Sequence, residues 1–546
     1  MIKRFTILFS AAVLCLSAAV SCTNPDAIKP TKNVIVMITD GTSTSALACS
    51  RWYKLYMGGE DKLAIDEVLC GMVRSHMSDA PISGSAAAMS AYMTGVLQQS
   101  PNISVYPFAH PGADIKPVDT TRTLQPAMTV MEAAKYEQGK STGVVVTVEY
   151  AHATPAATSS HSYSRNDYQS IGSQMASFRH DVVFSGGNQY ITDSMKEIFE
   201  ENGTTLLQDD IEGFRAYESE GPVWALFNKT SMKYNIDRDP AKEPSLAEMT
   251  DKAIKLLSRN KKGFFLMVEG SQVDYAGHAN DAVGLMTELI AFDDAVKVAL
   301  DFAKKDGNTT VVILPDHGNC GISLAKPGYK GYSERGVNDA YAGVDKIKAS
   351  ISGISAQLKV APVAEIRNVF FENTGIELTD AEEAAIKAHL THSVTDYMQI
   401  AGSLNAEVTG IVNSRLNFAY LNTGHTSEDV FLCIYNPNDQ RLEGIHSNVE
   451  LAGYLCAVAG LKKTLQQDSD ELFVKADEVF AGLEMAVETD GVEPVLVVKN
   501  GGKELRAVAN RAYVTVDGEK VDLPMETIYM KKNKTFYVPT CLKDLI

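Results

Sequence analysis

Residues 262–281 read KGFFLMVEGSQVDYAGHAND, and residues 308–319 read NTTVVILPDHGN. Each stretch opens with a near-continuous apolar run, which is typical of a strand that is buried on both faces of a sheet. The residues between them carry apolar side chains at helical spacing: Leu285, Leu289, Phe292, Val296, Ala299 and Ala303. A strand, a helix and a second strand in this order predict a parallel βαβ unit.

The same strand pattern recurs at three other places in the chain. It appears in KNVIVMITDG (residues 32–41), STGVVVTVEYAHAT (residues 141–154) and DVVFSGGNQ (residues 181–189). The repeated alternation predicts an α/β fold with a mostly parallel central sheet flanked by helices on both faces. Sites in open parallel sheets form at the carboxyl ends of the strands. The polar residues expected there are Asp40, His152, Glu269, Asp274 and Asp316.

Two regions depart from this alternation. From about residue 324 to residue 417 the sequence becomes helical, with a capping box at Thr379 and Glu382. We expect a helical insertion near the site, within a domain that spans residues 33–463. Residues 464–546 carry short apolar runs separated by turn residues, which predict a small β-rich C-terminal domain.

The first 22 residues resemble an export signal. Lys3 and Arg4 precede an apolar run that is short for a membrane span but suits a signal-peptide core. Small residues before Cys22 are typical of a bacterial lipoprotein site, but Ala19 stands where leucine is usual, so plain signal-peptidase cleavage stays open. A polar linker follows at residues 23–32. We therefore expect an exported protein, either periplasmic or anchored to a membrane as a lipoprotein.

Composition narrows the class of partner. The chain has 546 residues and a formal net charge of −18, which argues against nucleic acid. Small phosphate esters stay open, because bound metals can reverse the local field. Apart from Cys22, the six cysteines outside the signal are scattered and form no CxxC pair, so neither a zinc knuckle nor a dense disulfide scaffold is indicated. We expect mostly buried thiols and one disulfide bridge at most.

Ser85 lies in DAPISGSAAAMSAYMTG, residues 79–95, directly before a helical run of small residues. Its hydroxyl is expected at a helix N-terminus, where backbone N–H groups and the helix dipole suit a phosphoryl group. Taken alone, this pattern favours an ordinary N-cap serine over a catalytic one.

Carboxylates and imidazoles gather at the predicted strand ends. Asp274 and His278 are four residues apart, so one helical turn can present both to a metal ion. Asp316 and His317 are adjacent after a buried strand, and His425 lies in the glycine-flanked stretch LNTGHTSEDV. Each signal alone is also typical of capping or turn contacts, but their combination favours a metal site.

A further polar group lies in EYAHATPAATSSHSYSR, residues 149–165. His152 and Thr154 are two apart in an expected extended stretch and can face the same side. Arg165 can form a bidentate fork to phosphate oxygens, although a surface arginine in a loop is the simpler interpretation. His161 either supports the site residues or makes only local contacts.

Together these five ordered motifs resemble the alkaline phosphatase family, from about residue 33 to residue 461. The resemblance implies hydrolysis of phosphate monoesters through a phosphoserine intermediate, with Ser85 as nucleophile and Arg165 as the phosphate-binding arginine. It implies one zinc ion at Asp274, His278 and His425, and a second at Asp40, Asp316 and His317. It also implies a third metal, expected to be magnesium, at Asp40, Thr154 and Glu269, with His152 as a ligand or a supporting neighbour.

Three positions depart from the family pattern. Gly84 precedes Ser85 where aspartate is common, and that aspartate holds the arginine. We therefore expect Arg165 to be more mobile and phosphate to bind less tightly. His152 stands where some members have aspartate, and Tyr275 where others have lysine or histidine. Nitrogen donors favour zinc or cobalt over magnesium, so the identity of the third metal stays open.

Other functions remain as alternatives. A phosphodiesterase or nucleotide pyrophosphatase of the same superfamily would keep two metals and a hydroxyl nucleophile, but the Arg165 segment favours monoesters. An inactive surface-binding lipoprotein would not need so many converging ligands. A sulfatase is disfavoured, because we find no CxPxR or SxPxR sequence. We expect small-molecule phosphate monoesters as partners, no nucleic acid, and a membrane only through lipid on Cys22. Family members are often dimers, which leaves a homodimer open.

Overall fold

A computed structural model of the chain describes residues 28–390, 403–489, 491 and 493–546. The predicted signal peptide, Cys22 and most of the linker lie outside the described residues. None of the helices in the described ranges has the length and apolar character needed to cross a membrane. The described cysteines are free thiols: Cys49, Cys70, Cys320, Cys433, Cys456 and Cys541. No disulfide bridge therefore joins any two of them.

The core of the molecule is a ten-stranded sheet with the order β14-β2-β13-β8-β1-β7-β3-β4-β6-β5. Its strands are β1 (Asn33–Thr39), β2 (Leu69–Arg74), β3 (Ser141–Glu149), β4 (Val182–Gly186), β5 (Thr205–Gln208), β6 (Val223–Leu226), β7 (Phe264–Gly270), β8 (Thr309–Leu314), β13 (Val430–Tyr435) and β14 (Gly444–Ser447). Only β13 pairs antiparallel with its neighbours, β8 and β2. The predicted mostly parallel sheet is confirmed.

The register of the central strands brings their polar ends to one level. Ile38 of β1 lies opposite Glu269 of β7 on one side and opposite Leu314 of β8 on the other. Asp40 and Asp316 each follow two residues later, so both leave the sheet at the same edge as Glu269. Every residue of β1, β7 and β8 is buried, which explains their continuous apolar sequences.

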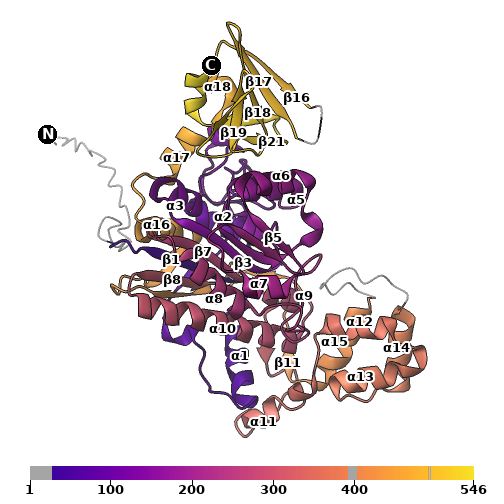
Figure 1. The fold of residues 1–546 in the computed structure, drawn as a ribbon. Helices are drawn as coiled ribbons and strands as arrows, with labels where there is room; N and C mark the ends of the chain where they lie inside the picture. The colour runs from indigo at the N-terminus through magenta and orange to yellow at the C-terminus, as the bar shows by residue number, and fades with distance from the viewer. Residues whose placement is uncertain (1–27, 391–402, 490, 492) are drawn as a thin grey trace, which may run out of the picture.

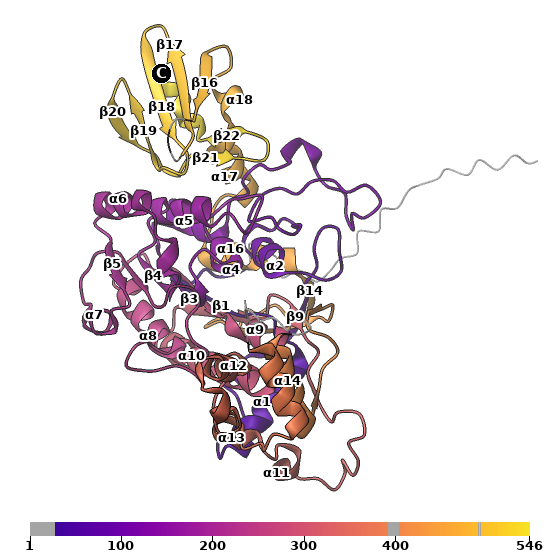
Figure 2. The same ribbon diagram turned by 90° about the vertical axis from the view of Figure 1, so that its right-hand side faces the viewer.

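Helices cover both faces of the sheet (Figures 1 and 2). On one face lie α1 (Thr44–Tyr56), α8 (Leu246–Leu257) and α10 (Ala282–Asp306); on the other lie α2 (Ser85–Thr94), α3 (Val130–Gln138) and α16 (Asn448–Ala459). The predicted helix between β7 and β8 is α10. It begins after the Asp281 side chain, which caps it by accepting from Gly284 N at 2.8 Å, and ends at Gly307 with φ of 67°.

Shorter elements complete this part of the chain. They are α4 (Ala153–Ala156), α5 (Tyr168–Ser177), α6 (Asp193–Asn202), α7 (Ile211–Ala216), α9 (Gln272–His278), β9 (Gly318–Asn319), β10 (Ser323–Leu324), β11 (Phe418–Ala419) and β12 (His425–Thr426).

The expected insertion is helical and lies beside α9 (Figure 1). It contains α11 (Val337–Ala340), α12 (Ile351–Val360), α13 (Ile366–Thr374), α14 (Asp380–His389) and α15 (Leu404–Arg415). The capping box of Thr379 and Glu382 forms at the start of α14, as predicted. The Thr409 hydroxyl donates to Ala279 O at 3.2 Å, and Asn413 Nδ2 donates to Asn280 O at 3.0 Å. These contacts tie the insertion to the residues that follow α9.

The β-rich C-terminal appendage is also confirmed and has its own apolar core. A five-stranded antiparallel sheet contains β16 (Glu484–Glu488), β17 (Val495–Asn500), β18 (Lys503–Val508), β19 (Tyr513–Val516) and β20 (Glu519–Asp522); a smaller one contains β15 (Val474–Lys475), β21 (Ile528–Met530) and β22 (Thr535–Val538). Two helices not expected from the sequence lie on either side of β15 along the chain: α17 (Leu465–Leu472) before it and α18 (Ala476–Val479) after it. The appendage stands over α5 and α6 (Figures 1 and 2).

Candidate metal centre

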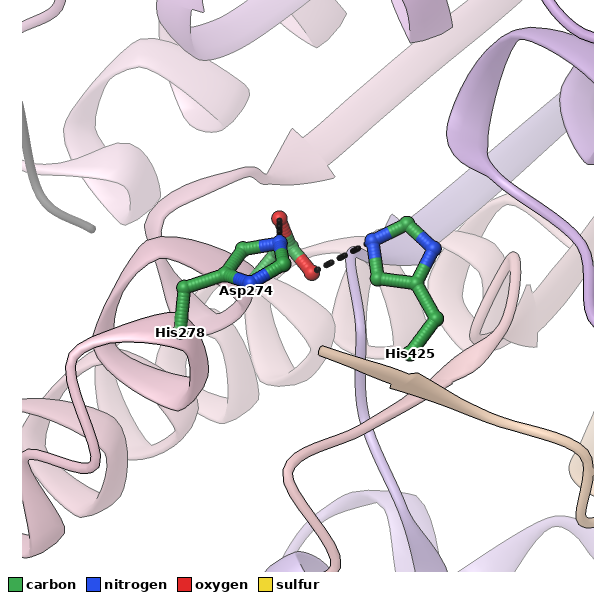
Figure 3. A group of neighbouring side chains, drawn as sticks. All are labelled: Asp274, His278 and His425. Carbon is green, nitrogen blue, oxygen red and sulfur yellow. Dashed lines mark ion pairs between the residues drawn. The ribbon is translucent and has the colours of Figure 1, made fainter. Parts of the chain in front are cut away.

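The first ligand group is built on α9, which directly follows β7. One turn of this helix places Asp274 and His278 on the same side, with His278 Nε2 3.3 Å from Asp274 Oδ2. His425 Nε2 approaches the other oxygen, Asp274 Oδ1, at 3.7 Å (Figure 3). His425 belongs to β12, which pairs with β9. In this pair His425 lies directly opposite Asn319 of β9. We call Asp274, His278 and His425 the α9 group.

The second ligand group lies at the ends of β1 and β8. His317 Nε2 is 3.6 Å from Asp40 Oδ1 and 3.3 Å from Asp316 Oδ2, and all three side chains are fully buried. Asp316 is oriented by the backbone N–H groups of Gly41 and His317, which donate to its Oδ1 at 3.0 and 2.9 Å. We call Asp40, Asp316 and His317 the β1 group.

Gly41 allows the α9 and β1 groups to approach each other. Its φ is 59°, a conformation that side chains disfavour. A Cβ atom at this position would lie 2.2 Å from Asp274 Oδ1. Glycine is therefore required by space as well as by backbone conformation.

The third ligand group collects Asp40, His152 and Glu269 at the ends of β1, β3 and β7, and we call it the β3 group. In each of the three groups, one ligand-capable atom per residue lies within 4.8 Å of the others. Thr154 is buried in α4, directly after the turn that carries His152. All the residues assigned to metals from the sequence are therefore brought to this edge of the sheet.

The histidines of the first two groups are held in a tautomer that suits a metal ligand. His278 Nδ1 donates to Thr423 O at 2.6 Å, His425 Nδ1 to Ser83 O at 2.8 Å, and His317 Nδ1 to Gly318 O at 3.2 Å. In the neutral form of each ring, Nε2 is then the atom with the lone pair, and it faces the carboxylates. Backbone carbonyls thus orient all three rings.

The electrostatics of the centre favour divalent cations. Burial raises the pKa of Asp40 well above its usual range, and the nearby Asp316, Asp274 and Glu269 add to the rise. Burial also raises the pKa of Glu269 to about 8. Both oxygens of Asp40 and Oδ2 of Asp316 are buried and accept no hydrogen bond from any described residue. So many carboxylates with unused lone pairs fit metal ions, which would neutralise their charge.

Ser85 is the first residue of α2, and the interpretation of it as an N-cap is wrong. The N-cap is Gly84, and no side chain caps this helix. The Ser85 hydroxyl instead lies 3.3 Å from His317 Nε2, beside the β1 group. A buried hydroxyl at a helix N-terminus thus faces the candidate metal ligands.

Arg165 reaches the β3 group through a histidine. Its Nη2 donates to His152 Nε2 at 2.8 Å. Burial and the adjacent guanidinium lower the pKa of His152 to about 3, so this ring is neutral. No carboxylate forms an ion pair with Arg165 among residues 28–390, 403–489, 491 and 493–546. A Cβ on Gly84 would meet only the His425 ring, at 3.7 Å.

His161 does not belong to the centre. Its Nδ1 contacts Ser104 O at 2.8 Å, and its Nε2 contacts Glu132 Oε1 at 2.9 Å. The pair of His161 and Glu132 is fully buried. Of the two roles considered for His161, the structure favours local contacts.

Sequence reasoning missed two residues that orient the ligands. Asn319 Nδ2 donates to Asp274 Oδ1 at 2.6 Å and to the backbone oxygen of the same residue at 3.0 Å. The Ser271 hydroxyl donates to Glu269 Oε2 at 2.7 Å. Neither has a signal in the sequence, because both act through contacts that only the folded chain creates.

A polar cleft of about 840 Å³ lies beside α9. Its lining includes Tyr190, Ser231, Gln272, Tyr275 and Lys348. The Tyr275 ring is edge-on to the His152 ring, with 6.1 Å between their centroids. The cleft therefore extends along the carboxyl edge of the sheet, next to the β3 group.

Comparison with known proteins agrees with this arrangement. A model of the alkaline phosphatase family matches residues 31–461. Alkaline phosphatase 3 of Bacillus subtilis (strain 168) is 33% identical over 436 residues, which cover 77% of this chain and 87% of that protein.

Solved structures give the same result for the fold. The cold-active alkaline phosphatase of Shewanella sp. superposes with a TM-score of 0.66 at 26% identity, over 79% of this chain and all of the other. A histidine-to-aspartate variant of the TAB5 alkaline phosphatase, described with magnesium in its M3 site, has a TM-score of 0.56 at 22% identity and covers 80% of this chain and 100% of its own.

Proposed function

Since the chain belongs to the alkaline phosphatase family and is a phosphomonoesterase with a metal site, we propose that Ser85 is its nucleophile and that hydrolysis passes through a phosphoserine. The observation that carries this proposal is the position of the Ser85 hydroxyl. It lies at the start of α2 and 3.3 Å from His317 Nε2 of the β1 group. Backbone N–H groups at a helix N-terminus also suit the incoming phosphoryl group.

The three ligand groups would hold three metal ions. Zinc suits the α9 group and the β1 group, which combine imidazole nitrogen with carboxylate oxygen. Magnesium is our assignment for the β3 group with Thr154, where most donors are oxygens. Asp40 belongs to both the β1 and β3 groups, so it would serve as a ligand in both. When bound, such cations stabilise the attacking and leaving oxygens as Lewis acids and lower the pKa of hydroxyls and water.

The chain's own residues divide the remaining tasks. Ser85 Oγ loses its proton to water and attacks phosphorus. The P–O bond to the alcohol breaks, its electron pair goes to the alcohol oxygen, and that oxygen takes up a proton from water, which leaves a phosphate ester on the serine. Arg165 donates paired hydrogen bonds to two nonbridging oxygens and keeps the phosphoryl group in place. Water then attacks the same phosphorus atom, and the serine and inorganic phosphate are released. Ser85 and Arg165 thus provide the positioning that phosphoryl transfer chiefly requires.

The identity of the third metal depends on whether His152 serves as a ligand. Its Nε2 accepts from Arg165, and the ring is neutral, so it can supply nitrogen to the β3 group only when Arg165 releases it. We assign magnesium to this group, and His152 would serve it either as a ligand or as a supporting neighbour.

The alcohol portion of the substrate is loosely selected in this proposal. Recognition centres on the phosphoryl group, because Ser85, Arg165 and the ligand groups all act on the phosphate and none of them selects the alcohol. Small-molecule monoesters are therefore the expected partners, and the net charge of −18 disfavours nucleic acid. Export, lipid on Cys22 and a homodimer belong to the same proposal and rest on the N-terminal sequence and the family.

A direct assay tests the activity. Purified protein is given p-nitrophenyl phosphate or bis(p-nitrophenyl) phosphate, before and after chelation and after return of Zn²⁺ and Mg²⁺. We expect turnover of the monoester to exceed that of the diester, to vanish on chelation, and to return with both metals. Faster turnover of the diester would favour a phosphodiesterase, and no turnover of either ester after metal loading would favour a binding protein.

A further inference from the structure

The loop that carries Arg165 ends at a contact with the C-terminal appendage. Asp167, two residues after Arg165, caps α5 by accepting from Ser170 N at 3.3 Å. Both oxygens of Asp167 also accept from Lys531 Nζ, at 3.0 and 2.8 Å. Lys531 directly follows β21 in the appendage. One lysine thus links the distant C-terminal sheet to the start of the helix behind Arg165.

Arg165 has few other constraints. Its backbone N–H donates to Pro101 O at 2.8 Å, and its side chain contacts His152. Among the described residues no carboxylate pairs with Arg165, and Gly84, which precedes Ser85, has no side chain that could do so. The position of Arg165 therefore depends on how firmly the residues on either side of it are held.

The appendage holds α5 along its length. Asn510 Nδ2 donates to the Ser170 hydroxyl at 3.3 Å near the start of the helix, and Asn510 O accepts from the Ser177 hydroxyl at its end. Arg511 Nη2 donates to the Ser194 hydroxyl of α6 at 2.6 Å. Because these contacts hold α5 and α6 against the appendage, a shift of the appendage would move the start of α5.

We infer that Lys531 is a positioning residue for the phosphate-binding arginine, and that the C-terminal appendage acts in catalysis by holding the Arg165 loop through the ion pair of Lys531 and Asp167. The inference rests on the proposed role of Arg165. The Asp167 side chain is only 17% exposed, which shields the ion pair partly from solvent. The effect is expected on phosphate affinity, because the contact fixes the place of a binding group and touches no reacting atom.

The chain offers a matched control at the same interface. Lys520 of the appendage pairs with Glu201 of α6 at 2.8 Å, the same distance as the shorter contact of Lys531. The two lysine side chains are 43% and 45% exposed. The acceptor of Lys520 is more exposed than Asp167, at 45% against 17%, and it accepts one hydrogen bond from its lysine where Asp167 accepts two. Lys520→Met therefore removes a comparable lysine contact between the same two parts of the molecule, but one that does not lie beside Arg165.

The test measures KM for p-nitrophenyl phosphate and Ki for inorganic phosphate in the metal-loaded full chain. Lys531→Met should raise both constants about threefold without lowering kcat, as expected for a partly exposed ion pair. Lys531→Arg should recover most of the affinity, and Lys520→Met should leave both constants unchanged. Asp167→Asn keeps a helix cap and should reproduce the rise, which provides a second variant should Lys531→Met fail to fold.

A double-variant cycle shows whether the effect passes through Arg165. In an Arg165→Ala background, Lys531→Met should cause no further change in Ki. Equal effects of Lys531→Met and Lys520→Met, or a full effect of Lys531→Met in the Arg165→Ala background, would overturn the inference. A wild type without any phosphatase activity would instead contradict the proposed function, so the two failures are distinguishable.

Discussion

At the scale of single residues, the centre depends on the atoms that buried side chains leave without partners. Asp40 offers two such oxygens, and the histidines around it are turned by backbone carbonyls so that Nε2 faces the same space. Leaving buried polar atoms unsatisfied is costly in a folded protein unless a ligand takes them up. A cluster of divalent cations explains why these atoms are gathered.

Ser85→Ala tests the nucleophile. We expect kcat/KM for a monoester to fall by about 10³-fold or more, because the metals alone position water less well than a resident hydroxyl. The metal content and the unfolding temperature should stay near those of the wild type. Ser83→Ala is the matched control, because only the backbone oxygen of Ser83 contacts His425. Comparable losses in both variants would contradict the role of Ser85.

Asn319→Leu tests a residue that the sequence did not reveal. Its amide holds both the side chain and the backbone oxygen of Asp274. Removing such a supporting contact typically lowers metal affinity about 10- to 100-fold. Competition with a chromophoric chelator measures this change, and exposed Asn368→Leu should show none. Unchanged zinc affinity in Asn319→Leu would show that Asp274 is oriented by other contacts.

At the scale of secondary-structure elements, the sequence predicted those strands and helices whose apolar residues recur at regular local spacing. The apolar runs of β1, β7 and β8 are continuous because both faces of each strand are buried, and α10 shows helical spacing because one side faces the sheet. The spacing of Asp274 and His278 likewise became one turn of α9. These features depend only on neighbours along the chain.

Elements fixed by distant contacts were harder to predict. The short helices α17 and α18 were missed, because the short apolar runs from which residues 464–546 are interpreted begin only after these two helices. His161 could not be separated from the site residues, since its partner Glu132 lies 29 positions away. The placement of His425 relies on the pairing of β12 with β9, which no local pattern encodes. The resemblance to a known family supplied that information.

The turn between β1 and α1 gives a prediction at this scale. Gly41→Ala should abolish tight metal binding and activity, because the added Cβ would occupy the place of Asp274 Oδ1. Gly307→Ala is the control. It also has a positive φ, of 67°, but no atom of the described residues lies within 4 Å of the added Cβ. It should cost about 1 kcal/mol of stability and leave metal content intact. Full metal content in Gly41→Ala would contradict this account.

At the scale of the whole molecule, stability and metal binding are linked through pH. Burial raises the pKa of Glu269 from 4.5 to about 8 in the folded chain without metal, so the folded state retains a proton that the unfolded state loses between these values. The contribution of Glu269 to the stability of the metal-free protein should therefore fall as pH rises from 4.5 to 8, and the contribution of Asp40 falls in the same direction.

Bound metals replace that proton, so the loss should disappear in the metal-loaded protein. Thermal unfolding with and without chelator should show a gap in Tm that widens from pH 5 to pH 8. Control variants far from the centre, such as Lys520→Met, should show the same pH-dependent increase in the Tm difference. A gap that is constant or narrows with pH would show that the carboxylates do not carry the excess proton.

The sheet, the helical insertion and the C-terminal appendage have different roles in the molecule. The sheet brings the ligands to one edge, the insertion is tied to the residues after α9, and the appendage holds the helix behind Arg165. Such an arrangement places the reacting groups on rigid elements and supports them from outside, as precise sites require.

The most direct test of the account is mass-spectrometric mapping of the phosphorylated residue. The metal-loaded protein is mixed with p-nitrophenyl phosphate, quenched in acid during turnover, and digested. The account predicts a phosphoserine at Ser85 that is absent after chelation and in Ser85→Ala. Steady turnover with no phosphate on Ser85, or with phosphate on another residue, would contradict it.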